Sequence, residues 1–186
     1  MTFTGPAVVG GPDVTLTGTA ESIHAQLLQL NPQYDPWDFP EYQEKMAAQN
    51  MTRETWEAQV AGVSKRSNPL TKRGWLTCNV AGNEVGNWST QCSEGLHYLE
   101  RLNGYCGAPR GHAGCSRVSC SHNCGIFLCN DNSFAISVWC GNLAGDAWEI
   151  IGECAYSYNE WVASVKGQVF RDGPPAWNTV VREASC

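Results

Sequence analysis

Residues 115–131 read Cys115-Ser116-Arg117-Val118-Ser119-Cys120-Ser121-His122-Asn123-Cys124-Gly125-Ile126-Phe127-Leu128-Cys129-Asn130-Asp131. Two runs with strand-forming residues, 115–121 and 125–131, flank the turn Ser121-His122-Asn123-Cys124. Polar turn residues between two such runs are a hairpin signal. The stretch therefore predicts an antiparallel β-hairpin.

Further elements are predicted on both sides of this hairpin. Leu96, Leu99 and Leu102 recur at helical spacing before it, and Ile150 and Ile151 belong to a similar stripe after it. In chain order the predicted elements are a strand at 75–80, a helix from Ser89 or Thr90 to about Asn103, a Gly-rich loop at 104–114, the hairpin, a helix from Asn142 to about Cys154, and strands at 162–170 and 177–184. The order β-α-β-β-α-β-β predicts the α+β class, an antiparallel sheet with two helices packed on one face as a sandwich.

Cysteine is confined to this part of the chain. All ten cysteines lie in residues 74–186, which makes about 9% of that part and indicates a disulfide scaffold. They are Cys78, Cys92, Cys106, Cys115, Cys120, Cys124, Cys129, Cys140, Cys154 and Cys186. The even number predicts five bridges and hence secretion into an oxidising, extracellular environment. The alternative is zinc bound by Cys120, His122, Cys124 and Cys129, but a second paired Cys or His motif is lacking.

Residues 1–73 differ from the rest because they lack cysteine. Residues 1–18 are rich in Gly, Pro and Thr and predict a flexible start, followed by short helices at 19–30, 41–49 and 53–62. We expect this segment to have few core residues and to be weakly stable alone.

Two Lys-Arg pairs, Lys65-Arg66 and Lys72-Arg73, lie just before the first cysteine. They resemble the cleavage sites of kexin-type proteases of the fungal secretory pathway. We therefore expect residues 1–73 to be a pro-segment that is cut off after Arg73, with Arg66 as a secondary site. Residues 74–186 would be the mature domain.

The charge of the chain argues against some classes of function. The net charge is −6, and residues 74–186 carry six basic and ten acidic residues. This balance argues against a nucleic-acid partner or stable insertion into an anionic membrane.

Met1-Thr2-Phe3-Thr4-Gly5 has no signal-peptide pattern, so we expect the sequence to begin after a removed signal. The triplets at Asn50 and Asn87 match the N-glycosylation sequon.

Catalytic motifs are not evident in the sequence. It contains no Gly-x-Ser-x-Gly, His-Glu-x-x-His or phosphate-binding glycine loop, and an even cysteine count leaves no odd nucleophile. We expect no catalytic residue, metal or cofactor. Paired carboxylates of a hydrolase have no fixed spacing and remain an alternative. The helical acids Glu94, Glu100, Asp146, Glu149 and Glu153 are most simply solvated.

The cysteine-bearing first strand, the helix, the Gly-rich loop and residues 115–123 together resemble the fungal killer-toxin-like proteins of the killer protein four type. The tail, from Gly167-Gln168-Val169 to Ser185-Cys186, is similar too. The resemblance implies the bridges Cys78–Cys154 and Cys120–Cys186, leaves the other six cysteines unassigned, and implies an exposed functional role for Arg117. Because long Gly-rich loops often carry binding, Arg110 and His112 are further candidates.

By this resemblance the chain is a secreted fungal effector or killer-toxin-like protein that is not an enzyme. It would bind a target-cell or plant-host protein after pro-segment removal and act as a monomer. The alternatives are a small secreted hydrolase or hydrolase inhibitor, and an antimicrobial protein. The negative charge of residues 74–186 counts against direct membrane attack by an antimicrobial protein.

Overall fold

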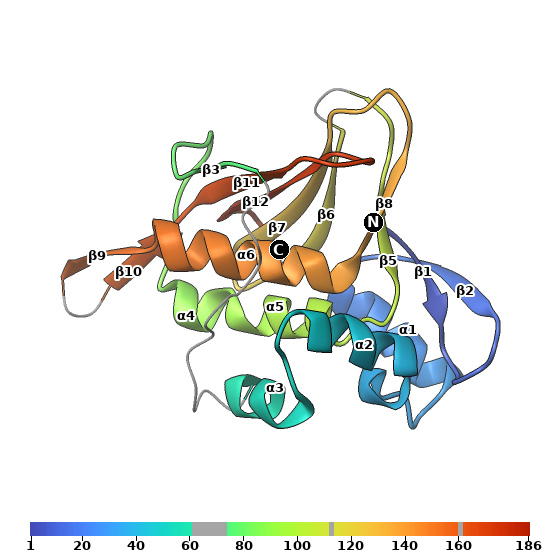
Figure 1. Ribbon diagram of the computed structural model, residues 1–186. Helices are drawn as coiled ribbons and strands as arrows, with labels where there is room; N and C mark the ends of the chain where they lie inside the picture. Colours follow the sequence, from blue (N-terminus) through green and yellow to red (C-terminus); the bar gives the residue numbers. More distant parts are fainter. Residues whose placement is uncertain (61–73, 112–113, 160–161) are drawn as a thin grey trace.

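The structure is a computed structural model that describes residues 1–60, 74–111, 114–159 and 162–186 (Figure 1). Its strands are β1 (Thr2–Pro6), β2 (Asp13–Thr17), β3 (Leu76–Thr77), β4 (Val85–Gly86), β5 (Tyr105–Ala108), β6 (Gly114–Ser121), β7 (Cys124–Asn130), β8 (Ile136–Trp139), β9 (Tyr156–Asn159), β10 (Val162–Val165), β11 (Gly167–Arg171) and β12 (Trp177–Glu183). The helices are α1 (Ala20–Leu30), η1 (Pro36–Asp38), α2 (Pro40–Ala48), α3 (Arg53–Val60), α4 (Trp88–Gln91), α5 (Ser93–Glu100) and α6 (Cys140–Cys154).

The central sheet is antiparallel and has the strand order β3-β11-β12-β7-β6. Its β6–β7 hairpin turns at His122 and Asn123, which both have positive φ, as a tight hairpin turn requires. Helices α5 and α6 lie side by side against one face of this sheet (Figure 1). Their apolar stripes, with Leu96, Leu99 and Ile150, are fully buried there.

A second antiparallel sheet has the order β2-β1-β5-β8. It corrects two predictions, since residues 1–18 were expected to be flexible and 104–114 to be a loop. The apolar residues Phe3, Val14 and Leu16 alternate along β1 and β2, and Gly10-Gly11 connects the two strands. This alternation is typical of strands. Gly10, Gly11 and Pro12 lie in the connection between the strands, whereas Gly5 and Pro6 belong to β1 itself.

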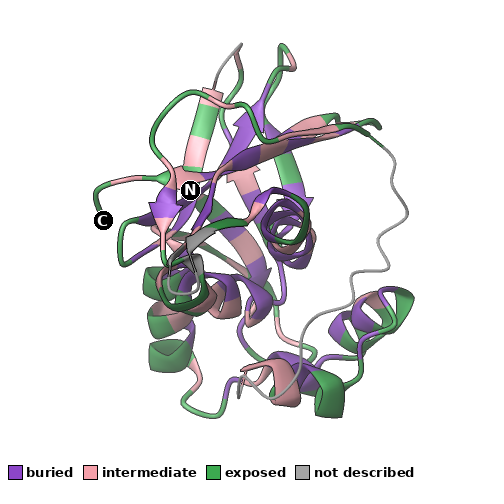
Figure 2. Ribbon diagram, turned by 90° about the vertical axis from the view of Figure 1, so that its left-hand side faces the viewer, coloured by how far each residue is buried: buried purple, intermediate pink, exposed green. Residues whose placement is uncertain are grey.

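The N-terminal helices begin where the sequence predicts. The Thr19 side chain caps α1, and Pro40 lies in the first turn of α2, where its missing N–H is tolerated. The expectation of few core residues is wrong. Twelve hydrophobic residues of this segment are buried: Phe3, Ala7, Ala20, Ile23, Leu27, Tyr34, Trp37, Phe39, Tyr42, Met46, Met51 and Trp56. Figure 2 colours the buried parts of the chain purple.

Two other predicted elements are divided in the structure. The helix expected from Ser89 or Thr90 to Asn103 is split at Cys92 into α4 and α5. The strand expected at 162–170 is split at Lys166, and β10 joins β4 and β9 in a third sheet while β11 joins the central one.

All ten cysteines are paired, which confirms the prediction of a disulfide-rich α+β protein with antiparallel sheets. The bridges are Cys78–Cys154, Cys92–Cys124, Cys106–Cys140, Cys115–Cys129 and Cys120–Cys186. The first and last are the two pairs that the family resemblance implies. Five bridges are compatible with a secreted protein. Within the described ranges, no helix is long and apolar enough to cross a membrane.

Candidate functional site

The face of the central sheet opposite α5 and α6 is called here the outer face. The strand register sets its composition, because residues directly opposite each other in antiparallel strands share a face. One row across the sheet therefore holds Arg117, Phe127, Val180 and Gln168. The neighbouring row holds Cys115, Cys129, Asn178 and Phe170.

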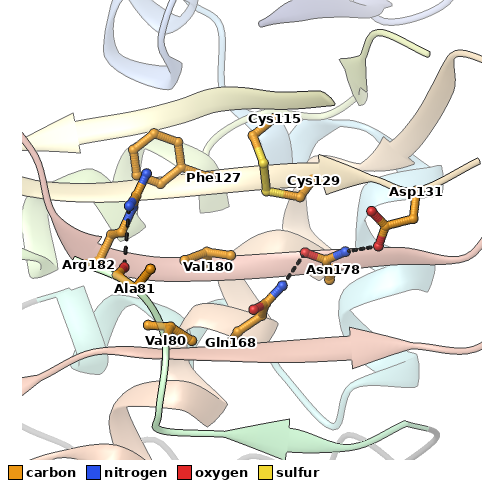
Figure 3. A pocket seen from close by; sticks show the side chains of 10 residues that line it. All are labelled: Val80, Ala81, Cys115, Phe127, Cys129, Asp131, Gln168, Asn178, Val180 and Arg182. Atoms are coloured by element: carbon orange, nitrogen blue, oxygen red, sulfur yellow. Dashed lines mark hydrogen bonds between the residues drawn. A yellow bond between two sulfur atoms is a disulfide. The ribbon is translucent and has the colours of Figure 1, made fainter. Parts of the chain in front are cut away.

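A hollow of about 250 Å³ lies on the outer face (Figure 3). It is lined by Val80, Ala81, Cys115, Phe127, Cys129, Asp131, Gln168, Asn178, Val180 and Arg182. Val180, Phe127 and the Cys115–Cys129 bridge supply apolar surface, whereas the polar side chains lie toward the ends. The hollow is therefore amphipathic, with an apolar middle between a carboxylate end and a guanidinium end.

A hydrogen-bonded row of side chains forms the carboxylate end. Gln168 Nε2 donates to Asn178 Oδ1 over 2.6 Å, and Asn178 Nδ2 donates to Asp131 Oδ2 over 2.9 Å. Because Asn178 is buried and bonded on both sides, its amide is held in one orientation. Asp131 is exposed and has a second carboxylate oxygen with which it can accept a bond from a partner.

The guanidinium end is built around Phe127. The Arg182 guanidinium lies 5.2 Å from the centre of the Phe127 ring, and Arg182 also donates to the Ala81 carbonyl oxygen. The Phe127 ring lies over Gly125, where a Cβ atom would come within 2.7 Å of it. Glycine at position 125 therefore lets the ring lie flat on the sheet beside Arg182.

Arg117 lies on the outer face and is exposed, as its predicted role requires. Its guanidinium donates to the Ser185 carbonyl oxygen over 2.8 Å and so holds the segment that the Cys120–Cys186 bridge also ties down. A second arginine thus lies one strand away from Phe127. The arrangement combines an aromatic ring, two guanidinium groups and a carboxylate on the outer face.

Of the loop candidates, Arg110 lies at the carboxylate end of the sheet. Arg110 is exposed, and its loop is held by a bond from Gly111 N–H to the Asn132 carbonyl and by Asn130, which donates to the Pro109 carbonyl. His112 lies outside the described residues. Asn87 is exposed at the start of α4, with positive φ. The two Lys-Arg pairs at 65–66 and 72–73 lie outside the described residues.

The expectation of solvated carboxylates is wrong for Asp146 and Glu100, which are almost fully buried. Asp146, on α6, accepts bonds from Arg171 Nε at 2.8 Å, Trp177 Nε1 at 2.9 Å and Thr179 Oγ1 at 2.7 Å. Burial raises the pKa of the Asp146 carboxyl, and Arg171 and the donated bonds oppose this rise. Arg171 also binds Glu149, so this ionic network ties α6 to the central sheet.

Glu100 is the second buried acid. It accepts a bond from Trp148 Nε1 over 2.9 Å and lies 3.0 Å from His97 Nδ1. Both buried acids follow the apolar stripe of their helices, since Asp146 is three residues after Leu143 and Glu100 is four after Leu96. Helical spacing was therefore a signal that these acids face the core.

Ser121, His122 and Glu94 form a cluster of the residue types that a hydrolytic triad uses. Ser121 Oγ donates to Glu94 Oε2 over 3.0 Å and lies 2.9 Å from His122 Nδ1. Glu94 reaches the same His122 nitrogen at 3.4 Å. In a hydrolytic triad the two histidine nitrogens contact different partners. Here both contacts involve Nδ1, so the cluster does not have triad geometry.

The zinc alternative is wrong, because Cys120, Cys124 and Cys129 are bonded to Cys186, Cys92 and Cys115. In the described part of the chain, no group of three or more His, Cys, Asp or Glu residues is arranged to hold a metal ion.

Comparisons with known proteins give no relative: no family model matches the chain, and no curated protein or solved structure gives a significant match.

Proposed function

We propose that this chain is a secreted fungal effector or killer-toxin-like protein that acts by binding a target-cell or plant-host protein through the outer face. The residues around Cys115–Asn123 and the bridges Cys78–Cys154 and Cys120–Cys186 support this class. The proposal includes the β-α-β-β-α-β-β sandwich of that family as the core of residues 74–186.

The outer face is the observation that carries the proposal. Helices cover one side of the central sheet, whereas the other side presents Phe127 between Arg117 and Arg182 beside the hollow. Aromatic and arginine side chains carry much of the energy at protein interfaces. The guanidinium groups suit an acidic group on the partner, and Asp131 suits a hydrogen-bond donor at the other end of the hollow.

Maturation by a kexin-type protease is part of the same proposal. The support is the sequence, in which two Lys-Arg pairs stand at the boundary between the cysteine-free and cysteine-rich parts. A cut after Arg73 would convert the precursor into the active protein.

The test is binding of the fluorescently labelled protein to plant leaf protoplasts and to cells of a filamentous fungus. Phe127→Ala should lower the bound amount at least about tenfold, as expected for a central interface residue. Arg117→Glu should act in the same direction. The matched control is Phe134→Ala, since Phe134 is 55% exposed and does not line the hollow.

Equal binding by the Phe127 variant and the control would contradict a role for the outer face. Two parallel assays address the alternatives. Hydrolysis of fungal or plant cell-wall polysaccharides by the wild type would favour the hydrolase class, and leakage of anionic lipid vesicles would favour direct membrane attack.

A further inference from the structure

Residues 1–60 complete the structure of residues 74–186. Strand β1 pairs with β5 in the register Thr2–Gly107, Phe3–Cys106 and Thr4–Tyr105, and so lies inside the second sheet rather than beside it. Without β1, the backbone N–H and C=O groups of β5 on that side would have no strand partner. An unpaired strand edge of this kind favours aggregation.

The contact between the two parts is too close for two independently packed surfaces. A Cβ atom at Gly104 would lie 2.5 Å from the Phe3 ring and 2.6 Å from the Thr4 carbonyl oxygen. A Cβ atom at Gly5 would lie 2.5 Å from the Asn103 carbonyl oxygen. Each part therefore has a glycine where the backbone of the other part approaches, and Phe3 is fully buried.

The helical part of residues 1–60 is bonded to the same region. The Tyr34 hydroxyl accepts a bond from Asn103 N–H over 2.9 Å, and the Tyr42 hydroxyl donates to the Glu100 carbonyl oxygen. The Tyr42 ring also meets the Trp139 ring edge-on, with 5.9 Å between their centres. Both hydroxyl groups therefore bond to backbone groups at or just beyond the C-terminal end of α5.

Covalent bonds do not join the two parts apart from the chain itself, because residues 1–77 contain no cysteine. Cleavage between them would leave only strand pairing, hydrogen bonds and apolar burial. Strand addition by β1, the Tyr34 and Tyr42 hydrogen bonds, and the packing of Phe3 against Gly104 are contacts of the kind that hold stable interfaces together.

We infer that residues 1–60 stay bound to residues 74–186 after cleavage, so that the processed protein has two non-covalently associated chains. The cut segment is then a permanent subunit that covers the β5 edge and the C-terminal end of α5, rather than a discarded leader. This inference rests on the cleavage proposed above. It replaces the expectation that the active form lacks the segment.

The test separates retention from processing. A site for a sequence-specific protease is placed within residues 61–73 of the full chain, the chain is cut completely, and the product is examined by size-exclusion chromatography and native mass spectrometry. We expect both pieces in one peak at the mass of the uncut chain. Denaturant without reductant should release them as two masses, because no disulfide connects them.

A matched pair of variants tests the interface itself. Gly104→Ala places a methyl group against Phe3 and Thr4, whereas Gly152→Ala, on α6, meets nothing within 4 Å. After cutting, Gly104→Ala should speed release of residues 1–60 at least tenfold, and Gly152→Ala should leave the rate unchanged. Both substitutions lie in the disulfide-bonded part, whose fold is checked by circular dichroism before the cut.

Loss of either piece from the peak, by separation or by precipitation, would overturn the inference. Kexin-type protease applied to the unaltered chain is a separate arm. If that protease fails to cut while the engineered cut product stays together, the proposed maturation is wrong and the interface stands. If the kexin-type protease cuts cleanly and the two pieces then separate, the proposed maturation stands and the inferred retention of residues 1–60 is wrong.

Discussion

The two parts of this chain reach a packed state by different means. Residues 74–186 contain five disulfides, and their largest helix, α6, is tied to the sheet by a buried ionic network. Residues 1–60 contain no disulfide and have twelve buried hydrophobic residues. Bridges mainly restrict the unfolded chain, whereas burial stabilises only the folded one. The two parts should therefore respond differently to the same treatment.

Reduction of the five disulfides should have the largest effect on stability. Each bridge typically contributes about 2–4 kcal/mol to stability. The total stability of a folded protein is typically only about 5–15 kcal/mol, so the loss of five bridges should exceed most of these values. We expect reductant to unfold residues 74–186 at 25 °C and, with them, the segment that packs on them. Circular dichroism with and without reductant measures this, and native spectra after complete reduction would contradict it.

Asp146→Asn should have the next largest effect. The change removes the charge that faces Arg171 in a buried site, which typically costs about 3–5 kcal/mol. Urea unfolding with intact disulfides is the measurement. Glu153→Gln, at an exposed position on the same helix, is the control and should stay within about 0.5 kcal/mol of the wild type.

Two leucines of α1 test the burial of residues 1–60. Leu27 is fully buried and Leu30 is 54% exposed, so the same substitution removes core packing at only one of them. Leu27→Ala should lower the free energy of unfolding by about 2–5 kcal/mol, and Leu30→Ala by less than about 0.5 kcal/mol. Equal effects in thermal or urea unfolding would show that α1 is not held as described.

Acid should weaken the contact around His24 slightly. His24 lies near Tyr98, and burial together with the charge of Arg101 lowers its pKa. The unfolded segment therefore binds a proton more readily, so the stability present above the ordinary pKa of 6.5 is lost as the pH falls below it. Because the ring is partly solvated, we expect less than about 1 kcal/mol. Urea unfolding at pH 7.5 and 5.5 measures it, and His24→Gln should flatten the difference.

Local signals predicted the helices and the central hairpin well. Thr19, Pro40 and the His122-Asn123 turn act through neighbouring residues, so a short window of sequence reveals them. Strands β1 and β5 were missed because each is short, lies beside glycine-rich sequence and pairs with a partner about 100 residues away. The apolar alternation along β1 and β2 was a local signal of strands, but a partner at this separation is not visible in a short window of sequence.

The candidate site was only partly predictable for the same reason. Arg117 was identified from a motif, but Phe127, Asn178 and Arg182 meet only through the register of β6, β7 and β12. The buried Asp146 was different, since its place on the apolar stripe of α6 was visible in the sequence. Asp146 was nevertheless expected to be solvated, because its side chain is charged.

The pairing of β1 with β5 also implies a delay during biosynthesis, because the two strands are far apart in the sequence. Thr4 faces Tyr105 across the sheet, so β1 leaves the ribosome about 100 residues before its partner exists. At about 5–20 residues per second, that delay is roughly 5–20 s. During this interval Phe3 and the edge of β1 that later pairs with β5 are available to chaperones, whereas β2 can already pair with the other edge. Strand β1 is thus made long before its pairing with β5 can form, and a nascent chain arrested before residue 105 should expose the β5-facing edge of β1 to protease.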